Sequence, residues 1–450
     1  MSAPRACVLN LGCRVNRVEC DWMESGLVDA GCLLVEEEDA DVVVVNTCAV
    51  TGEAEAKTRK AVRHAALLPR RPLVVVTGCS ANLFPDQLGA LGGSVSVCAE
   101  KSDVVRHALA LWASHEGALA ADVHAESLPA TDVPATDEGP RHGVFRVKRG
   151  VKVQDGCDNR CTYCIVWKAR GASRCLPYPQ ILSQVRRVLD EGAREVDLTG
   201  VNLGRYAGAT EEGEPVDLAS LIRRLAPVVR EAGATLRASS VEPPEAGGDL
   251  ADAMAENADV VAPHLHLPLQ SGCQRTLERM GRRYTASGFL ELVRSLREKL
   301  PTLSLTTDVI AGFPGETDED FAESFALCEE AGFSKMHVFR YSARPGTEAA
   351  SWPDQVPPEV SRARAAELRN LAARLRVRDM EGRLGSVETV LVERVLDDGT
   401  ASGTTASFHD FVVPAGAAGG SGLRGPGLLR ARFVGVDGGG DTPRLVAAPV

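Results

Sequence analysis

The sequence predicts an α/β protein in three parts: an N-terminal open parallel α/β sheet domain, a central partial (β/α) barrel and a small C-terminal β-barrel. Three observations predict this class. Valine-rich strands alternate with helical segments over the first 112 residues, and the alternation resumes from about residue 144 to 376. The last stretch, 377–450, has short strand-like runs and many glycines, as small β-barrels do.

Composition bounds the class of protein. The 450 residues suffice for two or three domains, and 44% hydrophobic and 25% charged residues with a mean hydropathy of −0.07 are ordinary for a soluble chain. No apolar run approaches the roughly 20 residues of a membrane span, and nothing at the start resembles a signal peptide. We therefore expect a cytoplasmic protein with no membrane partner.

Charge and cysteine content narrow the expected partners. A net charge of −11 argues mildly against a large nucleic-acid surface, so such a partner would be met by local basic patches. Thirteen cysteines in a reducing compartment favour metal ligands, reactive thiols or buried small side chains over disulfides.

The N-terminal part predicts three parallel strands, each followed by a cysteine. Strands are expected over 5–13, 39–48 and 71–79, ending at Cys13, Cys48 and Cys79, with helices over 16–31 and 51–68. Continuous valine runs indicate strands buried on both faces. Because the carboxyl ends of such strands meet at one crevice, these three thiols are expected to gather there.

The central part predicts repeated β/α units after a flexible linker over 113–143, which is rich in Ala, Thr, Pro and acidic residues. Strands with their following loops are expected over 194–203, 234–243, 264–272, 303–315 and 334–346, and helices over 179–193, 288–300, 318–332 and 360–380. In parallel barrels the chemistry lies at the carboxyl ends of the strands.

Cys157, Cys161 and Cys164 form a C-x-x-x-C-x-x-C motif, which chance places in about one such sequence in a hundred. Structural zinc sites need a fourth ligand, and no second C-x-x-C exists; His142 and His264 lack finger-like spacing. Iron–sulfur clusters normally use four cysteines, so three would leave one iron open to a small molecule. A zinc knuckle remains the alternative.

With Tyr163 before its last cysteine, this motif resembles the signature of radical S-adenosylmethionine enzymes. Together with LGCRVN, VVNTCAVT, VVVTGCSA, LTGVNLGRY, HLPLQSGCQRTLERMGRRYT and DVIAGFPGETDEDF, it resembles the methylthiotransferase family over nearly the whole chain. The resemblance implies a radical S-adenosylmethionine core over 144–376 and a TRAM-like RNA-binding barrel over 377–450. It also implies two 4Fe–4S clusters, a radical-generating one on Cys157, Cys161 and Cys164 and a sulfur-carrying one on Cys13, Cys48 and Cys79.

The same resemblance suggests contacts for S-adenosylmethionine. Gly200 and Asn202 would cradle its methionine amino group, and the backbone of Tyr163 would lie against its adenine. Residues at strand ends that would reach its ribose or carboxylate are Ser240, Glu242 and Gln270. Turn chemistry or packing explains each of these six as well. No catalytic residue beyond the cluster ligands is predicted.

The basic residue after Cys13, in LGCRVNRVECD, resembles the branch that acts on threonylcarbamoyladenosine at tRNA position 37, beside the anticodon, and attaches a methylthio group at C2. The implied partners are tRNA, an external electron donor and a sulfur source. Alternatives are the isopentenyladenosine branch, the branch acting on a ribosomal-protein aspartate, and a non-catalytic zinc-binding RNA module.

Basic side chains cluster in three places where they could hold phosphates, although solvated helix faces would look the same. They are Arg146, Lys148, Arg149, Lys152, Arg160, Lys168, Arg170 and Arg174; Arg275, Arg279, Arg282 and Arg283; and Arg362, Arg364, Arg369, Arg374, Arg376 and Arg378. The C-terminal module departs from the family pattern, since from Leu384 onward it has no lysine and five arginines against seven acidic residues.

Overall fold

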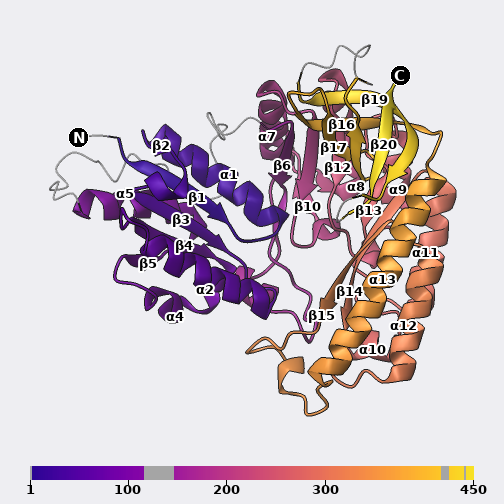
Figure 1. Cartoon of the computed structure of the whole chain (residues 1–450), viewed down its shortest axis with the longest axis horizontal. Coiled ribbons are helices and arrows are strands. Elements are labelled where there is room, and N and C mark those ends of the chain that lie inside the picture. The colour runs from indigo at the N-terminus through magenta and orange to yellow at the C-terminus, as the bar shows by residue number, and fades with distance from the viewer. Residues whose placement is uncertain (1–2, 116–145, 417–424, 440–441) are drawn as a thin grey trace.

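The computed structural model describes residues 3–115, 146–416, 425–439 and 442–450. It confirms the predicted α/β class: a parallel sheet, a curved set of parallel strands and a closed β-barrel follow one another along the chain (Figure 1). From residue 116 onward, the predicted linker lies outside the described residues.

The N-terminal domain is a five-stranded parallel sheet in the order β2-β1-β3-β4-β5. Its strands are β1 (Arg5–Asn10), β2 (Leu33–Leu34), β3 (Val42–Thr47), β4 (Leu73–Gly78) and β5 (Val95–Val97). Its helices are α1 (Arg14–Asp29), α2 (Gly52–Ala66), α3 (Cys79–Leu83), α4 (Pro85–Gly89) and α5 (Val104–His115), with 3-10 turns over Glu37–Asp39 and Lys101–Asp103.

Helices cover both faces of this sheet, which explains why β3 is buried at every residue. On one face Val44 packs with Leu27 of α1 and Val104 of α5. On the other face Val45 packs with Val62 of α2. The continuous valine run therefore has the origin that the sequence indicated, burial on both sides.

The central domain is built on six parallel strands that curve into a partial barrel. They are β6 (Lys148–Lys152), β9 (Glu195–Thr199), β12 (Thr235–Ala238), β13 (His264–His266), β14 (Ser304–Ala311) and β15 (Lys335–Arg340). Isolated bridges from Leu236 to Val261 and from Ser240 to His266 join the two three-stranded halves. The sequence predicted the last five strands and missed β6.

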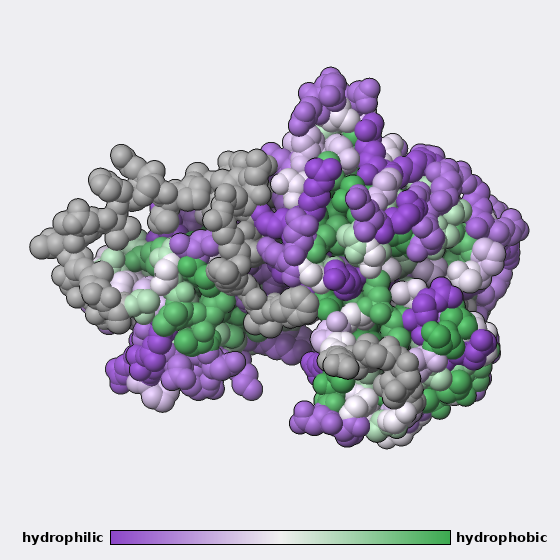
Figure 2. All heavy atoms as spheres, turned by 90° about the horizontal axis from the view of Figure 1, so that it is seen from above, coloured by the Kyte–Doolittle hydropathy of each residue, from purple (hydrophilic) through white to green (hydrophobic). Residues whose placement is uncertain are grey.

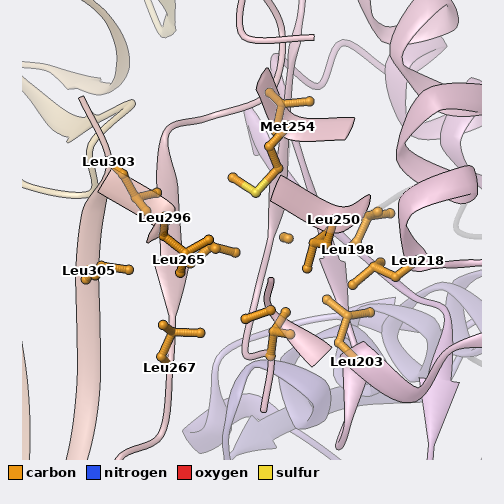
Figure 3. Packing of buried hydrophobic residues seen from close by; sticks show 14 of the residues in the cluster. Leu198, Leu203, Leu218, Leu250, Met254, Leu265, Leu267, Leu296, Leu303 and Leu305 are labelled. Atoms are coloured by element: carbon orange, nitrogen blue, oxygen red, sulfur yellow. The ribbon is translucent and has the colours of Figure 1, made fainter. Parts of the chain in front are cut away.

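Helices pack on the outer face of this barrel, and Figure 3 shows the leucines of strands and helices meeting there. The helices are α6 (Val166–Arg170), α7 (Tyr178–Asp190), α8 (Leu218–Glu231), α9 (Asp249–Glu256), α10 (Gln274–Arg279), α11 (Ala286–Lys299), α12 (Asp318–Ala331) and α13 (Pro358–Gly382). Short additions are β7 (Gln154–Asp155), β8 (Arg174–Cys175), β10 (Ala207–Ala209), β11 (Pro215–Asp217) and 3-10 turns over Leu203–Arg205, Pro243–Glu245 and Ala349–Ser351.

The C-terminal module is a closed barrel in the order β16-β17-β18-β20-β19. Its strands are β16 (Val387–Val395), β17 (Ala401–Thr405), β18 (Asp410–Val413), β19 (Gly427–Asp437) and β20 (Arg444–Pro449). Phe411 and Phe433 fill its core together with Met380, which α13 contributes. The long helix α13 thus belongs to both modules (Figure 1).

Within the described residues, no helix is long and apolar enough to cross a membrane. Figure 2 shows hydrophobic residues in separate patches among hydrophilic ones on the face in view.

Candidate functional site

The C-x-x-x-C-x-x-C segment forms a loop between β7 and α6 that backbone hydrogen bonds pin on both sides. The Cys157 N–H donates to Gly171 O at 3.1 Å, and the Thr162 N–H donates to Met280 O at 3.1 Å. Before the loop, Gly156 has a φ of +71°, and a Cβ there would overlap the carbonyl of Ala172. Glycine is therefore required where the chain turns into the loop.

The three thiols of this loop act on one another. Burial raises the pKa of Cys157, and the nearby Cys161 raises it further. Burial raises the pKa of Cys164 to about 12, with Cys161 and Cys157 adding to the effect. Adjacent buried thiols resist ionisation unless a cationic group replaces their protons, as metal binding does.

The second triplet gathers at the carboxyl edge of the N-terminal sheet, as predicted. Cys13 precedes α1, Cys48 follows β3, and Cys79 opens α3 directly after β4. Burial raises the pKa of Cys48, and the charges of Cys13 and Cys79 raise it further. The Ser80 hydroxyl fixes the Cys48 loop by donating to Cys48 O at 2.6 Å.

Among the described residues, no group of three or more His, Cys, Asp or Glu side chains converges as ligands of a single metal ion would. A multi-iron cluster binds each cysteine through a different iron, so it does not need the three side chains of a triplet to converge on one point. Both triplets offer thiols only, the usual donor set of such clusters.

The two triplets face each other across the contact between the domains. Cys79 and Ala49 pack with Ile165 and Ala169, which directly follow the loop of the first triplet. The side-chain amide of Asn82 donates to Ala169 O at 2.8 Å. Segments 87 residues apart in sequence are thereby held in contact beside both sets of thiols.

A chain of hydrogen bonds, buried from Asn16 onward, runs from one triplet to the other. The Cys13 thiol donates to Asn16 Oδ1 at 3.3 Å, and that oxygen also accepts from Arg170 Nη2 at 3.1 Å. Arg170 Nη1 donates to Asp155 Oδ1 at 2.9 Å, and the same oxygen accepts from the Gly156 N–H at 2.8 Å. Gly156 is bonded to Cys157, so the relay is continuous.

The carboxylate of Glu19 on α1 binds Arg170 of this relay and two lysines beside it. Its Oε1 lies 3.0 Å from Lys152 Nζ and 2.9 Å from Arg170 Nη1, and its Oε2 accepts from Lys101. Although burial raises it, Lys152 and Arg170 hold the pKa of Glu19 below its ordinary range. Lys152 and Arg170, grouped with candidate phosphate contacts in the sequence, are therefore buried structural partners instead.

The residues considered for S-adenosylmethionine lie around the first triplet. Asn202 Nδ2 is 4.0 Å from Cys157 Sγ. The Asn202 N–H donates to Gln154 Oε1 at 2.8 Å, and a Cβ at Gly200 would come within 2.9 Å of that same oxygen. Tyr163 packs edge-on against Phe313 with ring centroids 6.2 Å apart.

The other three candidates are spread along strand ends. Glu242 pairs with Arg282, and burial raises the pKa of Glu242 although Arg282 opposes this. Ser240 forms a backbone bridge with His266. Gln270 has a φ of +68° and uses its backbone to accept from the Ile310 N–H at 2.9 Å.

Arg282 is a residue whose place the sequence did not reveal. Its Nη1 lies 3.4 Å from Cys161 Sγ and 3.5 Å from the Tyr163 hydroxyl. A pocket opens here, lined by Asn159, Cys161, Arg205, Glu242, Pro244, Glu245, Gly281, Arg282 and Arg283. The sequence grouped Arg282 with possible phosphate contacts. Only its contacts with Cys161 and Tyr163, which lie 121 and 119 residues away in sequence, reveal its place at the site.

Comparison with known proteins identifies the family. Residues 5–99 match the model described as Uncharacterized protein family UPF0004, and residues 151–328 match the Radical SAM superfamily. Over 407 residues, the chain is 33% identical to the threonylcarbamoyladenosine tRNA methylthiotransferase MtaB of Thermotoga maritima, covering 89% of this chain and 90% of that protein. The chain belongs to the radical S-adenosylmethionine methylthiotransferases.

Other relatives of this methylthiotransferase are named for a different substrate. The chain is 35% identical over 392 residues to the tRNA-2-methylthio-N(6)-dimethylallyladenosine synthase of Methylococcus capsulatus, covering 85% of this chain and 83% of the relative. Among solved structures, the radical S-adenosylmethionine methyltransferase TsrM of Kitasatospora setae superposes with a TM-score of 0.54 at 15% identity, over 77% of this chain and 75% of that one. That likeness shows a shared fold.

Membership in the radical S-adenosylmethionine superfamily implies a 4Fe–4S cluster and S-adenosylmethionine. The residues of this methylthiotransferase fit both. Asn202 Oδ1 is buried and has no hydrogen-bond partner among the described residues. An unpartnered buried acceptor is costly, and beside Cys157 it is suited to receive a donor such as an amino group.

Proposed function

We propose that the enzyme methylthiolates C2 of threonylcarbamoyladenosine at position 37 of tRNA, using two 4Fe–4S clusters. The observation that carries the two-cluster part is the domain contact beside both triplets: Cys79 packs with Ile165 and Ala169, and a buried relay of hydrogen bonds runs from Asn16 through Arg170 and Asp155 to the loop of Cys157. A relay of this kind fixes the separation of two thiol triplets that would otherwise belong to independent domains.

In this proposal Cys157, Cys161 and Cys164 hold the radical-generating cluster, and Cys13, Cys48 and Cys79 hold the sulfur-carrying one. When bound, the first cluster and S-adenosylmethionine supply the radical needed to attack an unactivated C–H bond. The chain's own contribution is to hold the two triplets at a fixed separation and to exclude water from the space between them.

Six residues would hold S-adenosylmethionine beside the first cluster. Asn202 accepts its amino group on the unpartnered Oδ1, and Gly200 permits the close approach of Gln154, which holds the Asn202 backbone by accepting from its N–H. Around the rest of the cofactor we place Tyr163, Ser240, Glu242 and Gln270. An external electron donor and a sulfur source complete the cycle, and the cytoplasm is the expected compartment.

Relatives named as MtaB in Thermotoga maritima, Chlamydia pneumoniae and Bacillus subtilis, 33–34% identical, support threonylcarbamoyladenosine as the substrate. Dimethylallyladenosine in tRNA is the second candidate, because relatives named for it are 33–35% identical. Overall identity does not separate these two substrates, so the choice rests on the basic residue Arg14 after Cys13.

The test is mass spectrometry of tRNA nucleosides from cells with and without this gene. We expect the methylthio form of threonylcarbamoyladenosine to vanish on deletion and its unmodified precursor to accumulate. Loss of the methylthio form of dimethylallyladenosine instead would transfer the function to the second candidate.

Cysteine variants test the division of labour between the clusters. Cys13→Ala should retain reductive cleavage of S-adenosylmethionine and lose methylthiolation, whereas Cys161→Ala should lose both. Cys7→Ala, a half-buried thiol on β1, is the matched control and should keep both. Methylthiolation by Cys13→Ala would disprove the two-cluster assignment.

A further inference from the structure

The inner face of the partial barrel is mostly polar. Its polar side chains include Lys148 and Lys152 on β6, Glu195 and Asp197 on β9, Thr235 and Arg237 on β12, His264 and His266 on β13, Thr306 and Asp308 on β14, and Lys335 and His337 on β15. Ile310 and Phe339 are apolar residues on the same face. The residues that alternate with the inward ones, such as Val196, Leu236, Leu305 and Met336, belong to the outer core under the helices. Packed barrels fill this space with branched apolar side chains. Here the space between the inner faces of the strands, called the chamber below, is lined mostly by charged and polar groups, which suit a polar ligand.

Phe408 lies at the base of the chamber. It sits in the turn between β17 and β18 of the C-terminal barrel, with a φ of +66°, and its ring stacks on His264 with centroids 4.4 Å apart. Four cations approach the ring at 4.7 to 5.6 Å from its centroid: Arg14, Lys148, Arg237 and Lys335. They come from α1, β6, β12 and β15.

The carboxylates of Glu195 and Asp197 form ion pairs with two of these cations, Lys148 and Arg237. Glu195 lies 2.6 Å from Lys148 Nζ and 2.7 Å from Arg237 Nη2. Asp197 is shared, at 3.5 Å from Lys148, 3.6 Å from Arg237 and 3.9 Å from Arg14. Within the described chain, Lys335 has no ion pair. The charges of Arg14 and Lys335 are therefore the poorly compensated ones.

Arg14 is exposed, whereas Lys335 is half-buried beside exposed neighbours. The Arg14 side chain is 43% exposed although it reaches into the barrel. Lys335 shares its face of β15 with His337 and Phe339, and both of these are exposed, Phe339 at 40%. An open aromatic ring suits a nucleobase, and a guanidinium suits a carboxylate.

We propose that Arg14, assisted by Lys335, binds the carboxylate of the threonylcarbamoyl group and so selects this adenosine over one that carries a neutral dimethylallyl group. The inference rests on the proposed function and deepens it. It gives the basic residue after Cys13 a chemical role, since threonylcarbamoyladenosine carries an anion on its N6 substituent and dimethylallyladenosine does not. A tRNA backbone phosphate is the other anion that these cations could meet.

Binding of three synthetic anticodon stem-loops to the cluster-loaded enzyme separates these anions. The stem-loops carry threonylcarbamoyladenosine, its carboxylate methyl ester, or plain adenosine at position 37. We expect the wild-type enzyme to prefer the free carboxylate over the ester by about tenfold, as a charge-assisted hydrogen bond provides.

Arg14→Gln should abolish that preference, Arg14→Lys should keep part of it, and Lys335→Gln should reduce it. Arg294→Gln removes a charge from the outer helix α11, where Arg294 is 64% exposed, and should leave the preference intact. Iron content and melting temperature, measured in parallel, show that the variants fold and carry clusters.

The inference is overturned if Arg14→Gln and Lys335→Gln keep the wild-type preference. Equal weakening of all three stem-loops overturns it too, and assigns the cations to backbone phosphate. Failure of the proposed function is distinguishable, because it would show as unchanged tRNA nucleosides on gene deletion whatever the binding data.

Discussion

Val18 of α1 lies directly against Gly150 of β6, so that a Cβ at position 150 would overlap the Val18 Cγ2. Gly150 faces the inside of the barrel between Lys148 and Lys152. The missing side chain lets the N-terminal domain dock onto the first barrel strand, which brings Arg14 into the chamber and Glu19 to Lys152.

This contact predicts that Gly150→Ala overpacks the domain interface. We expect a loss of about 1–3 kcal/mol in the free energy of unfolding, measured by urea denaturation. Val18→Ala in the same chain should recover much of that loss, because it removes the overlapping methyl group. Gly93→Ala, with no atom within 4 Å of its Cβ, is the control. Equal losses in the single and double variants would contradict the contact.

The buried carboxylate of Glu19 predicts a larger effect. Glu19→Gln leaves Lys152, Arg170 and Lys101 without their shared anion, which should cost about 3–5 kcal/mol of unfolding free energy. Chemical denaturation measures it. Glu53→Gln breaks the exposed pair with Lys57 and should change nothing measurable. A Glu19→Gln protein as stable as wild type would show that this ion-pair network does not stabilise the contact between the domains.

The same residue predicts a pH dependence. Because the folded-state pKa of Glu19 lies below its ordinary value of 4.5, its stabilising effect is complete above that pH and is lost as the pH falls towards the folded-state pKa. The stability difference between wild type and Glu19→Gln should therefore shrink below pH 4.5, by about 1.4 kcal/mol per pH unit. Guanidinium unfolding of cluster-free protein measures it. A difference that stays flat under acid would refute the depressed pKa.

Phe408 predicts a coupling between the two barrels. Phe408→Ala removes the stack on His264 and the contacts with four cations, each worth about 0.5–2 kcal/mol. We expect faster amide hydrogen exchange over 401–413 and an earlier melting step for the C-terminal barrel. Val434→Ala, on an exposed position of β19, should show neither. An unchanged exchange pattern would contradict the coupling through Phe408 and leave α13 and the hydrogen bonds of Arg237 to Thr405 and Ala406 as the attachments of the module.

Sequence alone predicted what depends on local pattern. The valine runs that place Cys48 and Cys79 at the carboxyl ends of β3 and β4 follow from burial on both faces, and local spacing revealed the loop of Cys157, Cys161 and Cys164. The closed C-terminal barrel was also predicted, and its structure confirms it.

Sequence failed where partners lie far away. Strand β6 reads KRGVK, and its inward residues are a lysine, a glycine and a lysine because other segments answer them. Lys152 meets Glu19, 133 residues earlier, and Arg170 meets the same carboxylate across 151 residues. The periodicity of residues within one helix or strand carries no information on such long-range contacts. From the sequence, these cations therefore resembled surface groups that bind phosphates.

The position of Phe408 at the base of the chamber also has a consequence for protein synthesis, because the ribosome makes Phe408 after all the strands of the partial barrel. Only 68 residues separate Arg340, the last residue of β15, from Phe408. At about 5–20 residues per second, translation leaves the completed barrel strands without their base for roughly 3–14 s. A nascent chain with an apolar interior would expose a sticky cavity during that interval. The lysines, histidines and carboxylates along the inner strands instead hydrate readily. The interior of the unfinished barrel is therefore filled with water and has little tendency to aggregate before the C-terminal module folds.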